Sequence, residues 1–237
     1  MFKVKNFPCV ETLISHKSDG NVDPRFSPNF QIHKHLEKIA NKINSSLSDI
    51  VQMEQVHACR VIKVSEKHKG KIVPHSDGLI TNIPNLVLML RVADCISVLL
   101  VDPINKAIGL VHSGWKGTIG KITLVALQKM MREYGTNPSR VHLYLGPSIQ
   151  KCCYLTKDPL QAELPEWQKF IQKKGDQLAI DLPGFVKETA LQAGVQRMNI
   201  NSSHTCTVMD QNFFSFQRSL ANKEKEGRFA VMIKLRN

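Results

Sequence analysis

The sequence lacks the features of secreted and membrane proteins. Its six cysteines form no Cys-x-x-Cys pair and no regular disulfide spacing, which argues against a disulfide-stabilised scaffold. No apolar run reaches the length of a membrane-spanning helix, and residues 1–6 contain no apolar core of a signal peptide. We therefore expect a reduced, cytoplasmic protein with no membrane partner.

Several common catalytic and binding motifs are also missing. There is no G-x-S-x-G, G-x-G-x-x-G or H-E-x-x-H, and the nine histidines include a single His-x-His pair, His33-Lys34-His35. A conventional multicopper oxidase holds several copper ions with many histidines, and a single such pair is too few for that class. Aromatic residues are only 6% of the chain, and none is interleaved with the basic run at 63–71. Without such aromatics or a nucleic-acid motif, we expect no nucleic-acid partner.

Acidic residues are the scarcer charge. The chain has 32 Lys and Arg against 20 Asp and Glu, a formal charge of +12, which is compatible with an anionic small substrate. Its 237 residues contain no repeat and no low-complexity linker. We therefore expect residues 1–237 to form a single domain.

Hydrophobic periodicity predicts the secondary structure. Residues 1–30 are expected to be irregular. Helices are predicted at 32–47, 119–134, 159–173 and 182–193, and strands at 60–64, 86–92, 96–102, 107–112, 141–145 and 229–235. The mixture of strands and helices predicts an α/β protein with a mixed β-sheet flanked by helices.

Three residues, His57, Cys95 and His112, each lie at or near the end of an apolar run. Two imidazoles and one thiolate suit zinc and leave a fourth position open, as a catalytic metal requires. The spacings of 38 and 17 residues are too wide for a local zinc finger, so the fold would have to bring the ligands together. The alternative is two hydrogen-bonded histidines and a buried thiol. Asp94, beside Cys95, could orient a metal-bound histidine or form a turn.

Other residues are candidates for anion or metal binding. Lys116 lies where a helix is expected to begin, a position that favours anions. Arg218 and Arg228 could also bind an anion, although an ordinary surface arginine is the favoured interpretation of each taken alone. The adjacent pair Cys152-Cys153 is expected to be structural. His204 and Cys206 could form a second soft metal pair, with buried structural roles as the alternative.

Taken in order, the motifs resemble the YfiH or laccase-domain family, also called polyphenol oxidase-like and peptidoglycan-editing-factor proteins. Each piece is short, but the ordered set is specific. The matching pieces are Gln55-Val56-His57, Asp77-Gly78-Leu79-Ile80-Thr81, Ala93-Asp94-Cys95, His112-Ser113-Gly114-Trp115-Lys116-Gly117, Gly146-Pro147-Ser148-Ile149, Cys152-Cys153-Tyr154, Cys206-Thr207, Phe213-Phe214-Ser215 and Gly227-Arg228.

The resemblance implies a single-domain α/β layered sandwich and a zinc ion held by His57, Cys95 and His112. It implies a purine nucleoside phosphorylase that uses phosphate and acts on adenosine, inosine, guanosine and methylthioadenosine, with adenosine deaminase activity beside it. Two alternatives are a copper-dependent polyphenol oxidase, with Cu²⁺ in place of Zn²⁺, and a peptidoglycan quality-control factor. The oligomeric state is left open, with a monomer as the expectation.

The chain departs from the family pattern at several positions. Lys116 stands where arginine is usual, and Phe216-Gln217-Arg218 stands where Tyr-Arg-Arg is usual. The family's N-terminal Ser-x-Arg-x-Gly-Gly-Val-Ser is only echoed by residues 15–20, in which Lys17 is the candidate substrate contact. These departures bear on substrate contacts and leave the metal triple intact.

Overall fold

Two large mixed β-sheets form the centre of the molecule in the computed structural model, which describes residues 9–237. The five-stranded sheet has the order β1 (Val10–Ile14), β14 (Phe229–Leu235), β6 (Val87–Val92), β2 (Ile50–Met53) and β4 (Ile72–Val73). The six-stranded sheet has the order β13 (Ile200–Ser202), β9 (His142–Leu145), β7 (Ile96–Asp102), β8 (Ala107–Ser113), β5 (Gly78–Thr81) and β3 (Val61–Lys63).

Each sheet combines parallel and antiparallel pairs. In the five-stranded sheet, β14 runs antiparallel to both neighbours, whereas β2 runs parallel to β6 and β4. In the six-stranded sheet, β13–β9 and β3–β5 are parallel, and the central pairs are antiparallel. The mixed sheet predicted from the sequence is thus present twice.

Alternating side chains on the strands separate the layers. Leu88 and Leu90 of β6 belong to the core that also contains Leu99 of β7, so the two sheets pack face to face. Val87 and Met89 point the other way, toward the apolar face of the first helix. Both faces of the central strands are therefore buried, which explains their nearly continuous apolar sequence.

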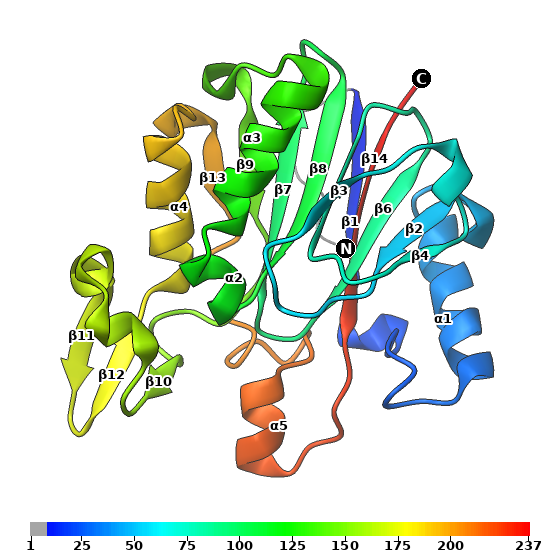
Figure 1. The fold of residues 1–237 in the computed structure, drawn as a ribbon. Helices are drawn as coiled ribbons and strands as arrows, with labels where there is room; N and C mark the ends of the chain where they lie inside the picture. Colours follow the sequence, from blue (N-terminus) through cyan, green and yellow to red (C-terminus); the bar gives the residue numbers. More distant parts are fainter. Residues whose placement is uncertain (1–8) are drawn as a thin grey trace.

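Helices cover the outer faces of the two sheets and complete a four-layer α/β sandwich (Figure 1). Helix α1 (Asn29–Asn41) packs on the five-stranded sheet. Helices α3 (Ile122–Tyr134) and α4 (Leu182–Gln192) pack on the six-stranded sheet. The short helices α2 (Trp115–Ile119) and α5 (Phe216–Asn222) lie near one end of the sheets. The predicted layered sandwich is confirmed.

The helix predicted at 159–173 is wrong. The structure has two 3₁₀ segments there, Leu160–Glu163 and Pro165–Phe170, followed by strand β11 (Ile171–Lys174). Pro165 cannot continue a helix because it lacks an N–H and clashes with the preceding turn. Strand β11 joins a small sheet with β12 (Gln177–Ile180) and β10 (Leu155–Thr156).

The irregular segment predicted at 1–30 is also corrected, because Val10–Ile14 forms β1, whose five residues all pair with β14. Residues 1–8 of that prediction lie outside the described part of the chain. Within the described part, no helix combines the length and hydropathy needed to cross a bilayer.

Among the loops that lead from one large sheet to the other, two are important for the site. Residues 54–60 connect β2 of the five-stranded sheet to β3 of the six-stranded sheet. Residues 93–95 connect β6 to β7 in the same direction. Each of these crossover loops carries one of the predicted metal ligands.

Candidate metal centre and its pocket

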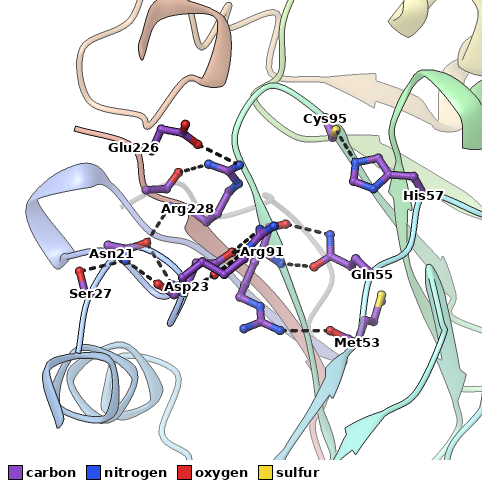
Figure 2. A network of polar contacts seen from close by, with 12 residues as sticks. Asn21, Asp23, Ser27, Met53, Gln55, His57, Arg91, Cys95, Glu226 and Arg228 are labelled. Carbon is purple, nitrogen blue, oxygen red and sulfur yellow. Dashed lines mark hydrogen bonds and ion pairs between the residues drawn. The ribbon is translucent and has the colours of Figure 1, made fainter. Parts of the chain in front are cut away.

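The structure brings His57, Cys95 and His112 together. Their ligand atoms all lie within 4.8 Å of one another. Cys95 Sγ is 3.9 Å from His57 Nε2, and the His57 and His112 ring centroids are 4.7 Å apart at 83°. The Cys95 thiol and the His57 ring face each other across the two crossover loops (Figure 2). This donor set fits zinc by ligand type, number and convergence.

Local backbone geometry positions each ligand. His112 lies near the end of strand β8 and is buried. His57 has a φ of +60°, a left-handed conformation that is uncommon for a residue with a side chain. Gly114 leaves the space the ligands need, since a Cβ there would lie 2.9 Å from the His57 ring and 3.2 Å from Cys95 Sγ. Any side chain at residue 114 would press on two ligands.

A buried carboxylate, Asp77, orients the two histidines. It lies 2.8 Å from His112 Nδ1, so that nitrogen donates the hydrogen bond and, in the neutral ring, Nε2 keeps its lone pair for a metal. Asp77 also accepts hydrogen bonds from the backbone N–H of His57 at 3.0 Å and of Ala58 at 2.8 Å. Burial acts to raise the pKa of Asp77, but these hydrogen bonds outweigh it and lower the pKa.

Asp94, which we expected to orient a site histidine, has other partners. Its carboxylate accepts hydrogen bonds from Thr207 Oγ1 at 2.6 Å and from the Gln217 backbone N–H at 2.7 Å. With a φ of +81°, it forms the turn that presents Cys95. The histidine-orienting role therefore belongs to Asp77, and Asp94 ties the Thr207 and Gln217 segments to the centre.

The electrostatics of the centre favour a thiolate at Cys95, whereas His112 must release a proton before it can bind a metal. Burial acts to raise the pKa of Cys95, but the two histidines beside it lower the pKa to about 6. Burial acts to lower the pKa of His112, but Cys95 and Asp77 raise it to about 9. The thiolate that a soft cation requires is thus stabilised by the site itself.

The centre opens into a pocket of about 750 Å³, within the size range of small-molecule sites. Trp115, Tyr154 and Phe216 give the pocket aromatic walls. Its cationic lining residues are Arg25, Arg91 and Arg228. The pocket therefore joins flat apolar surface, positive charge and a three-ligand centre.

The arginines are held differently from one another. Arg25 is neutralised by Asp23, whose carboxylate accepts hydrogen bonds at 2.6 and 3.0 Å. Arg228 lies over the Phe26 ring at 4.8 Å, and its ion pair with Glu226 is long, at 3.6 Å. Arg91 is in no ion pair within residues 9–237, and its guanidinium makes a 3.4 Å contact with the Met53 carbonyl.

A network of neutral groups fixes these arginines beside the centre (Figure 2). The Gln55 amide forms two hydrogen bonds with the Arg91 backbone, at 2.8 and 2.9 Å. The Asn21 Oδ1 accepts hydrogen bonds from the backbone N–H groups of Arg228 and Asp23. Gln55 is two residues before His57, so the same loop positions a ligand and a cation.

Of the four cations proposed from the sequence, only Arg228 lines the pocket. Lys116 is exposed, and its Nζ lies 5.4 Å from the centroid of the Trp115 ring, outside the pocket lining. Arg218 is buried, and its guanidinium donates to the Thr207 and Phe213 carbonyls and to Glu224. Lys17 pairs with Glu224 at 3.5 Å.

The Arg218 guanidinium is thus engaged by the protein itself, and Lys116 and Lys17 are not among the residues that line the pocket. Sequence reasoning missed Arg25 and Arg91, which have no motif of their own. It also missed the role of Asp77, although the Asp77–Thr81 segment was one of the matching pieces.

Comparisons with known proteins agree with this fold. A family model described as "Multi-copper polyphenol oxidoreductase laccase" matches residues 28–236. The purine nucleoside phosphorylase YlmD of Bacillus subtilis is 30% identical over 216 residues, covering 84% of this chain and 76% of that protein. An adenosine deaminase RL5 from an unknown prokaryotic organism is 27% identical, covering 76% of this chain and 74% of that protein.

Among solved structures, the hypothetical protein YfiH of Bacillus licheniformis superposes with a TM-score of 0.88. It is 27% identical in sequence, and the match covers 96% of this chain and 93% of that one. The layered architecture and its strand connections are thus shared with a relative over nearly the full length of both proteins.

Proposed function

Because this chain belongs to the family described as multi-copper polyphenol oxidoreductase laccase, whose relatives include proteins named purine nucleoside phosphorylase, we propose that it is a metal-dependent phosphorylase of purine nucleosides. The observation that carries the proposal is the pocket itself. It combines the His57–Cys95–His112 centre with aromatic walls and with Arg91 and Arg228. The aromatic walls can bind the base of a nucleoside, and the arginines can bind phosphate.

The His57–Cys95–His112 donor set favours zinc in this role. A zinc ion held there supplies a Lewis acid and lowers the pKa of a water in its open position. Asp77 keeps the His112 ring in the orientation and tautomer that a metal requires.

The aromatic side of the pocket suits the purine base. Trp115, Tyr154 and Phe216 offer ring faces on which a base can stack. Burial raises the pKa of Tyr154, so its phenol stays protonated at neutral pH and can donate a hydrogen bond to the substrate. The Asp94 carboxylate already accepts hydrogen bonds from Thr207 and Gln217, so it is engaged within the protein.

The arginine side of the pocket suits phosphate. Arg228 and Arg91 present guanidinium groups that match phosphate oxygens in geometry and charge. In phosphorolysis, a phosphate oxygen attacks C1′ of the ribose while the C1′–N9 bond breaks and its electrons leave with the base. Two arginines that fix the phosphate on one side of the sugar would place this nucleophile opposite the base.

The test is a reaction of the purified, metal-analysed protein with adenosine, inosine, guanosine and methylthioadenosine. We expect free base and a ribose 1-phosphate product only when phosphate is present, read by mass spectrometry. The Cys95→Ala variant should lose the reaction together with the metal. Equal base formation without phosphate would identify a hydrolase and overturn the proposal.

A second candidate activity is adenosine deamination, favoured by the relative named adenosine deaminase and by a centre of three protein ligands, which would leave a bound zinc able to take a water. The same experiment separates the two reactions, because inosine formed from adenosine does not depend on phosphate. The family description also makes a copper-dependent phenol oxidase a candidate. Copper content together with dioxygen consumption on a phenol would identify that activity.

A further inference from the structure

A second cluster of soft ligands lies apart from the His57–Cys95–His112 centre. The thiols of Cys152, Cys153 and Cys206 lie within 4.8 Å of one another. Cys152 Sγ is 3.4 Å from Cys153 Sγ. We name these three residues the trithiol cluster. Its members come from two loops, one after β9 and one after β13, that are more than 50 residues apart in sequence.

Backbone hydrogen bonds hold the two loops together. Residues Ser148 and Cys206 form a parallel β-bridge, in which Thr207 N–H donates to the Ser148 carbonyl at 3.1 Å. Each loop then closes in its own turn. Cys153 N–H donates to the Gln150 carbonyl at 2.9 Å, and the Cys206 carbonyl accepts from Asp210 N–H at 2.9 Å. The three thiols are therefore brought together by hydrogen bonds of the folded backbone.

The Cys206 sulfur sits among backbone donors. Burial acts to raise the pKa of Cys206, but hydrogen bonds from backbone N–H groups of Gln150, Met209 and Val208 outweigh it and lower the pKa. Such donors stabilise a thiolate, the form of cysteine that binds metals. By contrast, burial and the Cys206 thiol raise the pKa values of both Cys152 and Cys153. A bound cation would offset that repulsion between thiolates.

We propose that the trithiol cluster is a second metal site, specific for a soft, thiophilic cation, with Cu(I) as the best match. Thiolates alone select soft ions, and Ca²⁺ and Mg²⁺ are disfavoured because the cluster offers no oxygen ligand. Zinc in proteins takes four ligands, whereas Cu(I) is stable with three sulfurs. His204, which we considered as a partner for Cys206, is not part of the cluster among the described residues.

A disulfide explains the cluster less well. Consecutive Cα atoms are about 3.8 Å apart, below the usual 4.4–6.8 Å of a disulfide, so a Cys152–Cys153 bond would be strained. A bond from Cys206 to either neighbour would leave the third thiol without a role. Exposed Cys152 instead gives an ion a route into the cluster from solvent.

The test is Cu(I) binding without oxygen, in competition with the chromophoric chelator bathocuproine disulfonate. The background is the Cys95→Ser variant, which disables the first centre. In this background we expect about one tightly bound Cu(I) per chain and a thiolate-to-copper charge-transfer absorption in the ultraviolet. Adding Cys206→Ser should weaken binding at least about 100-fold, since loss of an outer-shell partner alone costs about 10–100-fold.

Cys9→Ser is the matched control, because Cys9 lies beside β1 and outside the cluster. It should leave Cu(I) affinity and the absorption unchanged. Cys152→Ser replaces an exposed thiol and provides the same test if Cys206→Ser lowers the melting temperature. Unchanged affinity in both cluster variants overturns the proposal. So does a Cys206 disulfide whose reduction restores no Cu(I) binding.

Discussion

At the scale of single residues, the candidate centre depends on one buried carboxylate. Asp77 touches both histidine ligands, one through its ring and the other through its backbone. It thus sets the orientation of His112 and the path of the loop that carries His57. A ligand set so held requires little rearrangement when a metal binds.

Asp77→Asn should weaken zinc binding about 10–100-fold, because the amide has one acceptor oxygen and cannot replace every hydrogen bond of the carboxylate. Competition with a chromophoric zinc chelator would measure this loss. Asp181→Asn is the control, since Asp181 caps helix α4 and asparagine caps equally well. Zinc affinity that stays at the wild-type value in Asp77→Asn would contradict the orienting role.

Arg228 is the cation that we expect to contact phosphate. Arg228→Met should raise the KM for phosphate about tenfold to a hundredfold, since a hydrogen bond to a charged group contributes about 1.5–3 kcal/mol. The KM of Arg228→Lys should stay nearly as high, because lysine lacks the planar guanidinium that donates two hydrogen bonds to phosphate. Steady-state kinetics at varied phosphate would measure both.

Lys116→Met supplies the comparison, because Lys116 is exposed and outside the pocket lining. Its KM for phosphate should match that of the unaltered protein. A large rise in Lys116→Met with none in Arg228→Met would return the phosphate site to the start of α2.

The sequence could identify the three ligands but not the residues that support them. His57, Cys95 and His112 are recognisable because few residue types bind zinc and each ends an apolar run. Asp77 is 35 residues from His112, and only the pairing of β5 with β8 brings them together. An arginine has no comparable sequence pattern around it, so the sequence could not distinguish the buried Arg218 from Arg228, which lines the pocket.

At the scale of elements, the strands buried on both faces were the easiest to predict. Strands β7 and β14 match the predicted 96–102 and 229–235 residue for residue. Short strands such as β2 and β5 were missed, since four residues are too few to establish a period. The 159–173 segment has apolar residues at helical spacing, but Pro165 and the packing of Trp167 decide its structure.

Trp167 anchors this segment by stacking on Phe185 of α4, with centroids 3.8 Å apart and planes 6° apart. Trp167 is fully buried, so Trp167→Ala should lower the free energy of unfolding by about 3–5 kcal/mol. Urea unfolding would measure the change. Phe30→Ala is the control, because Phe30 is 72% exposed and should change stability by less than about 0.5 kcal/mol.

Trp167→Phe should lower the free energy of unfolding much less than Trp167→Ala does. It keeps a ring against Phe185 and removes an indole N–H that has no hydrogen-bond partner among the described residues. Equal losses in the two variants would show that the indole itself, rather than ring stacking, determines the stability of this segment.

At the scale of the whole molecule, the centre lies where the two sheets exchange chain segments. The crossover loops at 54–60 and 93–95 carry His57 and Cys95 to the interface between the two sheets, which is held together by the packing of their buried apolar side chains. The layered α/β class was predictable from the strand and helix pattern. The arrangement as two packed sheets was not, since the pairing of β14 with β6 joins residues more than 130 positions apart.

Metal removal should therefore leave the protein folded but less stable. Metal at about 100 times its Kd adds about 2.7 kcal/mol, and each kcal/mol shifts the Tm of a chain this size by about 2–4 °C. Chelator-treated protein should thus keep its circular dichroism spectrum and melt about 5–10 °C lower. Complete unfolding on chelation would mean that the metal organises the core.

The position of β14 between β1 and β6 also bears on biosynthesis. In the chain, β14 comes after all the other described strands. Strands β1 and β6 therefore leave the ribosome long before β14, which pairs with both of them. Arg228, directly before β14, reaches the pocket only when that strand inserts. A nascent chain interrupted before residue 228 would carry all three ligands and yet lack a finished pocket. The pocket is therefore completed only after translation has passed β14, and interrupted chains stay without it.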